Sequence, residues 1–217
     1  MKPPTKNQQA CCYCGDSFAS GEDVLRDTSP IFPEWEVIRH ELLFPYHRVC
    51  WCWDRIDRWL CVNAPLVYQQ LGKGATDDEI NLTVSRFHAL FPLDLHRSYR
   101  IHDGSGDGWL FDGGGMMSLH MMRHTADSAW NPTGEEMVWD HVPFIANCGG
   151  DYCCVDCNSV TGDGYGLVFW LSHETGAREV IASGFQHYLE RFAEALERGC
   201  YREKQYNTFP ALVPNEE

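Results

Sequence analysis

The sequence predicts an α+β fold in which helices flank a mostly antiparallel central sheet. First, helical patterns with capping signals occupy residues 64–104, where apolar side chains recur at helical spacing. Second, short β-like runs follow in hairpin order between residues 109 and 171. Third, the last strong pattern, over residues 183–199, is again an amphipathic helix. A chain of 217 residues is also long enough to bury its own core.

The chain begins with a cysteine pattern that is typical of a structural zinc site. Cys11 and Cys14 flank a tight turn, and His47 and Cys50 follow 32 residues later at i, i+3 spacing, which places them on one helix face. A short hairpin over residues 18–27 separates the two pairs, so the arrangement is similar to a treble-clef module. Zinc takes four nitrogen or sulfur ligands in a closed tetrahedral site. We therefore expect one structural Zn²⁺ ion bound by Cys11, Cys14, His47 and Cys50.

Two neighbouring cysteines leave the individual ligands open. Cys12 is adjacent to Cys11, and Cys52 lies two residues after Cys50, so either could replace a named ligand. The alternative for the whole cluster is a set of reduced cysteines packed in a core. We expect this zinc module to occupy residues 1–62 and a larger domain to span residues 63–217.

The larger domain opens with helical signals. Asn63 can cap a helix over residues 64–71, which Gly72 would end. Thr76 and Glu79 have the spacing of a capping box for a second helix, and a third, short helix starts at Pro92. The predicted β runs are residues 109–111, 142–146, 152–156 and 166–171, with a hairpin turn signal at Asp163-Gly164 between the last two.

The closing helix has the clearest pattern in the chain. Ser183 and Gln186 have capping-box spacing at its start, and Gly199 would end it. An apolar stripe indicates the face that packs against the rest of the domain. The stripe consists of Phe185, Leu189, Phe192 and Leu196.

A second cysteine cluster, at residues 148, 153, 154 and 157, could be a metal site. It lies in a predicted strand, and consecutive residues of a strand face opposite ways. Cys153 and Cys154 therefore cannot both bind one ion. We expect these cysteines to pack in the core, because a free cysteine behaves as a small apolar side chain.

The net charge of −14 excludes some classes of function. Residues 1–62 carry seven basic and nine acidic side chains, so most of the negative charge lies in residues 63–217. Direct nucleic-acid binding is disfavoured, because it needs a basic surface. No apolar run reaches the roughly 20 residues of a membrane span. The start of the chain lacks an apolar signal-peptide core, so we expect a cytoplasmic location.

Residues 66–201 resemble the SUKH superfamily, which includes the fungal Smi/Knr cell-wall regulators and many bacterial immunity proteins. The resemblance rests on the order and spacing of several segments. They are Thr76-Asp-Asp-Glu-Ile, the stretch 93–104, Gly149-Gly-Asp and Gly166-Leu-Val-Phe-Trp. The family usually has Asn where Asp103 stands, and the N-terminal zinc module lies outside its pattern.

The resemblance implies a non-enzymatic protein-binding domain. In bacteria this would be an immunity protein that neutralises a cognate toxin by binding and occlusion. The acidic charge favours a basic toxin domain as the partner. The alternative is a cytosolic regulatory or scaffold protein of the Smi/Knr type, and a remote alternative is a zinc-dependent enzyme. We expect no catalytic residues, because neither a Gly-x-Ser-x-Gly elbow nor the zinc-deaminase strings occur.

Aromatic and acidic side chains interleave in the predicted loops, and this pattern suits a protein interface with an apolar centre and a polar rim. The plainer alternative is that the tryptophans are core residues and the acids are merely solvated. The candidate partner-binding residues are Trp109, Asp127, Trp130, Trp139 and Asp140.

Overall fold

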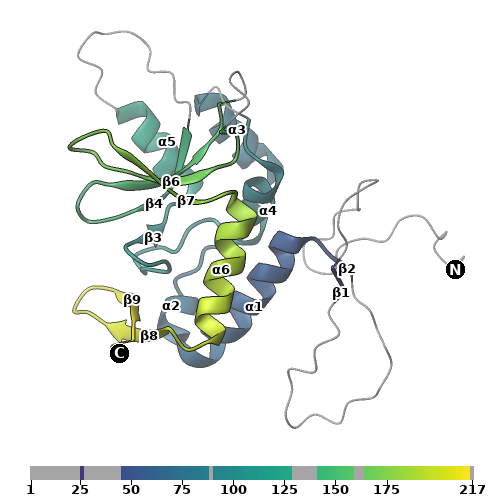
Figure 1. Cartoon of the computed structure of the whole chain (residues 1–217), viewed down its shortest axis with the longest axis vertical. Coiled ribbons are helices and arrows are strands. Elements are labelled where there is room, and N and C mark those ends of the chain that lie inside the picture. Colours follow the sequence, from purple (N-terminus) through teal and green to yellow (C-terminus); the bar gives the residue numbers. More distant parts are fainter. Residues whose placement is uncertain (1–24, 27–44, 88–89, 129–140, 159–163, 216–217) are drawn as a thin grey trace, which may run out of the picture.

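The computed structural model describes residues 25–26, 45–87, 90–128, 141–158 and 164–215. Its largest sheet has five strands in the order β3-β4-β5-β6-β7, and each neighbouring pair is antiparallel. This sheet and the helices around it confirm the predicted α+β architecture (Figure 1). The strands span Gly115–Met116, His141–Ala146, Tyr152–Asp156, Val168–Leu171 and Arg178–Ala182.

Helix α6 packs on the sheet, and helix α1 packs on α6 and α4 (Figure 1). Two small strand pairs lie outside the main sheet, β1 (Leu25–Arg26) with β2 (Pro45–Tyr46) and β8 (Tyr201–Gln205) with β9 (Pro210–Pro214). The helices are α1 (Arg48–Asn63), α2 (Pro65–Tyr68), α3 (Asp77–Phe87), α4 (Leu93–Ile101), α5 (Leu119–Ser128) and α6 (Phe185–Glu197).

The capping box predicted for α3 is confirmed. The backbone N–H and the hydroxyl of Thr76 both donate to the Glu79 carboxylate, each at 2.7 Å, and the Glu79 N–H donates to the Thr76 hydroxyl at 3.3 Å. These bonds satisfy backbone groups that the first turn of a helix otherwise leaves unpaired. They also lower the pKa of Glu79 below its usual value.

Helix α6 begins differently from the prediction. Its cap position is Gly184, and the Ser183 hydroxyl bonds the His187 ring instead of the helix backbone. The Gln186 N–H donates at 2.8 Å to the carboxylate of Asp94, at the start of α4. A charged acceptor from another helix therefore takes the place of the local capping box. The predicted apolar stripe of α6 is buried throughout, and Gly199 follows the helix with a left-handed φ of +71°.

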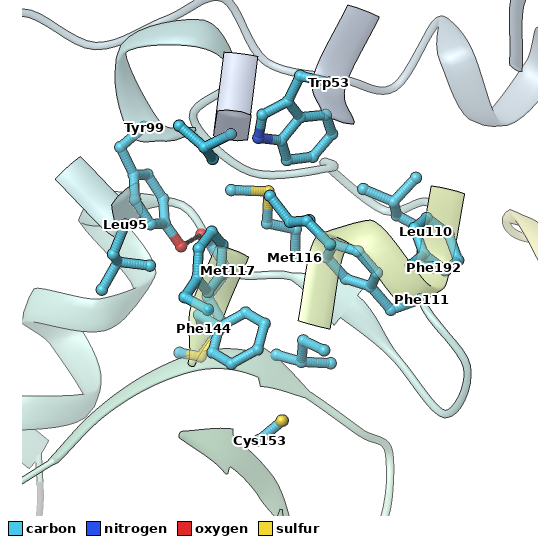
Figure 2. Close-up of a cluster of buried hydrophobic side chains, with 14 of the residues drawn as sticks. Trp53, Leu95, Tyr99, Leu110, Phe111, Met116, Met117, Phe144, Cys153 and Phe192 are labelled. Atoms are coloured by element: carbon cyan, nitrogen blue, oxygen red, sulfur yellow. Dashed lines mark hydrogen bonds between the residues drawn. The ribbon is translucent and has the colours of Figure 1, made fainter. Parts of the chain in front are cut away.

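Helix α1 contributes to the core of the larger unit, although the sequence assigned it to the N-terminal module. Trp53, Ile56 and Leu60 are fully buried in the same cluster as the sheet residues. Figure 2 shows Trp53 reaching this cluster from the side opposite to Cys153 of β5. The Trp53 indole donates at 2.6 Å to the buried hydroxyl of Ser98 on α4. Helix α1 therefore shares a core with residues on the other side of the boundary predicted between residues 62 and 63.

The sequence missed the hairpin β8–β9, which follows α6. The alternation of apolar and polar side chains is weak in β8, because most of Tyr201–Gln205 is exposed. The hairpin is tied to the domain by Trp109, which exchanges backbone hydrogen bonds with Pro210 and Leu212. Of the predicted strand 109–111, Trp109 therefore pairs with this small sheet, whereas Phe111 pairs with Gly114. Within the described residues, no helix combines the length and apolar character needed to cross a bilayer.

Candidate functional site

Two of the four predicted zinc ligands lie in the described residues. His47 immediately precedes α1 and Cys50 lies in its first turn, with exposed fractions of 2% and 0%. Cys11 and Cys14, like the alternative ligand Cys12, lie outside the described residues. No cluster of three or more metal-binding side chains occurs in the part of the chain that the structure describes. The zinc site therefore stays a prediction.

Cys52, the alternative ligand on this helix, is fully buried like Cys50. Burial raises the pKa of the Cys52 thiol to about 12, and the nearby charge of Glu190 on α6 adds to the rise. His47 and Cys50 lie three residues apart and so share one face at the start of the helix, whereas Cys52 lies five residues from His47. This spacing is the reason to name Cys50 as the ligand.

The strand cysteines face opposite sides of the sheet, as expected. Cys153 lies opposite Trp170 of β6, whereas Cys154 lies opposite Phe169. Both are fully buried, and burial raises the pKa of Cys153. Their thiols are packed as apolar groups.

Two of the five predicted partner-binding residues, Trp109 and Asp127, lie in the described residues, and the surface stays a prediction. Trp109 stacks on Phe209 in the C-terminal hairpin, with ring centroids 5.2 Å apart. Asp127, on α5, lies 3.7 Å from the Arg86 guanidinium of α3. Trp130, Trp139 and Asp140 lie outside the described residues.

A hollow of about 460 Å³ lies where α6, the sheet and the C-terminal hairpin meet. Its aromatic lining comes from Trp170 on β6, Tyr188 and Phe192 on α6, and Tyr201 on β8. Phe111 lies behind this lining, since its ring centroid is 5.5 Å from that of Tyr188 and 4.9 Å from that of Phe192. The lining is therefore backed by the core, which holds the aromatic rings in place.

The rim of this hollow carries both signs of charge. Asp112 and Glu194 supply carboxylates, and Arg191 and Arg198 supply guanidinium groups. The Arg191 Nη1 donates at 2.8 Å to the backbone carbonyl of Ile181, where β7 is irregularly paired with β6. Arg191 thus bridges α6 and the edge strand of the sheet.

Two tyrosine phenols of the hollow are held in their neutral form. Burial raises the pKa of Tyr188 well above its usual value, and the charge of Asp112 is among the smaller contributions to that rise. Burial also raises the pKa of Tyr201, and Asp112 is the next largest cause. Asp112 therefore acts electrostatically on both phenols, which remain hydrogen-bond donors at neutral pH.

A second hollow, of about 380 Å³, also has Trp170 in its lining. Asn147 and Asp151 line it from the β4–β5 turn, and Arg178 and Glu179 line it from β7. His173 bonds the Asp151 carboxylate through both its ring and its backbone N–H, and these bonds lower the pKa of Asp151. We call the two hollows together the Trp170 groove.

Gly113 lines the second hollow beside Trp170, the residue that both hollows share. Its φ of +87° belongs to the left-handed region, which favours glycine. A Cβ at this position would lie 3.5 Å from the Trp170 ring. The turn therefore lies directly against the indole. Aromatic side chains beside charged groups suit the binding of side chains from another molecule.

Sequence reasoning missed most of the groove. Trp170 was assigned only to a strand, and Tyr188 lies just beside the apolar stripe predicted for α6. One usable indication was the spacing of Tyr188, Arg191, Ala195 and Arg198, which places them on one helix face. That pattern predicts a second, amphipathic face on α6 but does not say what lies opposite it.

The chain is similar in sequence to known proteins. The sequence profile described as "SMI1 / KNR4 family (SUKH-1)" matches residues 74–191, which is more than half of the chain. A "Glucan synthesis regulatory protein" of Neurospora crassa is 40% identical over 58 residues, 27% of this chain and 11% of that protein. An "F-box protein SKIP16" of Arabidopsis thaliana is 28% identical over 88 residues, 41% of this chain and 18% of that protein. The chain thus spans less than a fifth of either curated relative.

Proposed function

Because this chain belongs to the SMI1/KNR4 family (SUKH-1), we propose that it is a non-enzymatic regulatory protein that acts by binding a protein partner. The observation that carries the proposal is the Trp170 groove. It offers aromatic side chains, fixed by the core behind them, together with a rim of both charges. Interfaces of regulated complexes use aromatic anchors surrounded by polar groups in this way.

The relatives support the regulatory alternative better than a toxin-neutralising role. One of them is described as a regulator of glucan synthesis. Neither of the two names describes an immunity protein. A Smi/Knr-type regulator in the cytoplasm is therefore the function we favour over an immunity protein that occludes a basic toxin.

We also propose that residues before α1 form a zinc-stabilised module joined to this domain. The support is that His47 and Cys50 stand one helical turn apart, both buried, directly after β2. Soft thiolate and imidazole donors in a closed set suit Zn²⁺ in a structural role. Bound zinc would hold the module together, because metal binding and folding are coupled in such small units.

The test of the proposed function is quantitative affinity capture from the cells that make the protein. Wild type is compared with Ala195→Arg, which fills the groove from α6. The control is His187→Arg, which adds the same side chain at an exposed position of the same helix. We expect at least one protein to be captured by wild type and the control but depleted with Ala195→Arg. Identical captures by all three would remove the groove as the binding site.

A further inference from the structure

We propose that the hollow between Trp170 and α6 receives a cationic side chain, arginine or lysine, from the protein partner. This inference rests on the proposed function, since it names the chemistry of the partner segment that enters the same groove. A guanidinium or ammonium group is attracted to aromatic faces and to carboxylates, and the hollow presents both.

The aromatic side chains provide the first half of the recognition. Trp170, Tyr188 and Tyr201 come from three different elements and line one hollow. A cation over the face of such a ring is stabilised by the ring's quadrupole, most strongly over tryptophan. The same protein uses this contact elsewhere, because the Arg55 guanidinium lies 4.3 Å from the centre of the Trp51 ring.

The carboxylates provide the second half. Asp112 lies close enough to the phenols of Tyr188 and Tyr201 to influence the ionisation of both. Glu194 adds a second carboxylate from α6. The C-terminal end of α6 also borders the hollow at Ala195 and Arg198, and the carbonyl end of a helix carries partial negative charge.

The two arginines of the rim balance the two carboxylates in charge, so the preference for a cation comes from the aromatic rings, the position of Asp112 and the helix end. Arg191 is held by its hydrogen bond to the Ile181 carbonyl of β7 and keeps its charge. Arg198 is an exposed residue at the C-cap of α6, where a cation is favoured by the helix end. At longer range the net charge of −14 attracts a basic segment and repels an acidic one.

The experiment is an NMR titration of the full-length protein with three capped amino acids. N-acetyl-arginine amide and N-acetyl-lysine amide carry the charge, and N-acetyl-citrulline amide is the uncharged analogue of the first. We expect the two cations to shift resonances of Trp170 and α6 at millimolar concentrations. Citrulline should bind at least about fivefold more weakly, because it lacks the charge.

Two variants test whether the Asp112 carboxylate contributes to this binding. Asp112→Asn should weaken arginine binding several-fold. Asp107→Asn, which removes an exposed carboxylate elsewhere in the same loop system, should leave it unchanged. Equal binding of citrulline and arginine, shifts away from the groove, or an unaffected Asp112→Asn variant would each overturn the inference. Groove-dependent capture of a partner without arginine binding would overturn only the inference. Arginine binding without groove-dependent capture would instead contradict the proposed function.

Discussion

Arg55 of α1 and Glu197 of α6 form a two-point ion pair, in which the arginine Nε and Nη2 donate to the two carboxylate oxygens. A second pair, Arg48 with Glu190, lies seven residues earlier on both helices, at 3.6 Å. This constant offset shows that the two helices run parallel in a fixed register. Because α1 lies outside the family match, these pairs join the segment before the match to α6, in which the match ends.

The two pairs should differ in their contribution to stability. The Arg55 side chain is 9% exposed and binds at two points, whereas Arg48 is 39% exposed. We expect Glu197→Gln to lower the free energy of unfolding by about 1 kcal/mol. The matched control Glu190→Gln should cost about 0.5 kcal/mol or less. Urea unfolding of both variants measures this, and equal losses would contradict the proposed ranking.

The family domain of this chain should require α1. Its side chains Trp53, Ile56 and Leu60 are fully buried, so a chain that starts at residue 63 would expose the core that they cover. We propose that the domain begins near residue 45. Residues 45–217 should unfold cooperatively, and residues 63–217 should not. If the shorter chain unfolds with the same midpoint and cooperativity as the longer one, α1 is dispensable.

Asp103 should make the stability of the domain depend on pH. Its carboxylate accepts the Leu119 N–H at the start of α5, yet burial raises its pKa above the usual value. A raised pKa in the folded state means that stability is highest below the unfolded pKa of about 4 and falls as pH rises through the folded value. Asp103→Asn keeps the acceptor without the charge, so it should be at least as stable as wild type at pH 7.

Urea unfolding at pH 4 and pH 7 tests this account of Asp103. The difference in stability between Asp103→Asn and wild type should grow in favour of the variant as pH rises. Asp107→Asn is the control, because Asp107 is exposed in the same loop. A variant that is less stable at pH 7 than at pH 4, relative to wild type, would contradict the account.

The zinc proposal is tested by a pair of variants on one helix. Freshly purified, reduced protein should contain about one zinc per chain. Cys50→Ser should lose most of this zinc, whereas Cys52→Ser should keep it, because Cys50 has the i, i+3 spacing to His47 and Cys52 does not. The measurement is the zinc content per chain of wild type and of the two variants. Zinc-free wild type would contradict the site, and equal loss in both variants would contradict the assignment of Cys50.

Local patterns were sufficient for the cap of α3 and for the buried face of α6. Thr76 and Glu79 are three residues apart, and the α6 stripe repeats within one helix, so both could be predicted. The acid that caps α6 could not, because Asp94 lies 92 residues before Gln186. The groove could not be predicted for the same reason. Asp112, Trp170 and Tyr201 are far apart in the sequence and meet only in the folded chain. The β8–β9 hairpin lacks the apolar alternation that identifies a strand, because β8 is mostly exposed and consecutive residues at the start of β9 are buried.

The most direct test of the account asks whether a partner occupies the Trp170 groove in the cell. A photo-crosslinking amino acid is placed at Ala195, which lines the groove, or at His187, an exposed position that does not line it. After illumination, the account predicts a discrete crosslinked product from position 195 and none from position 187. Crosslinking to a protein from position 187 alone, or no product at 195 while a stable partner is captured, would contradict it.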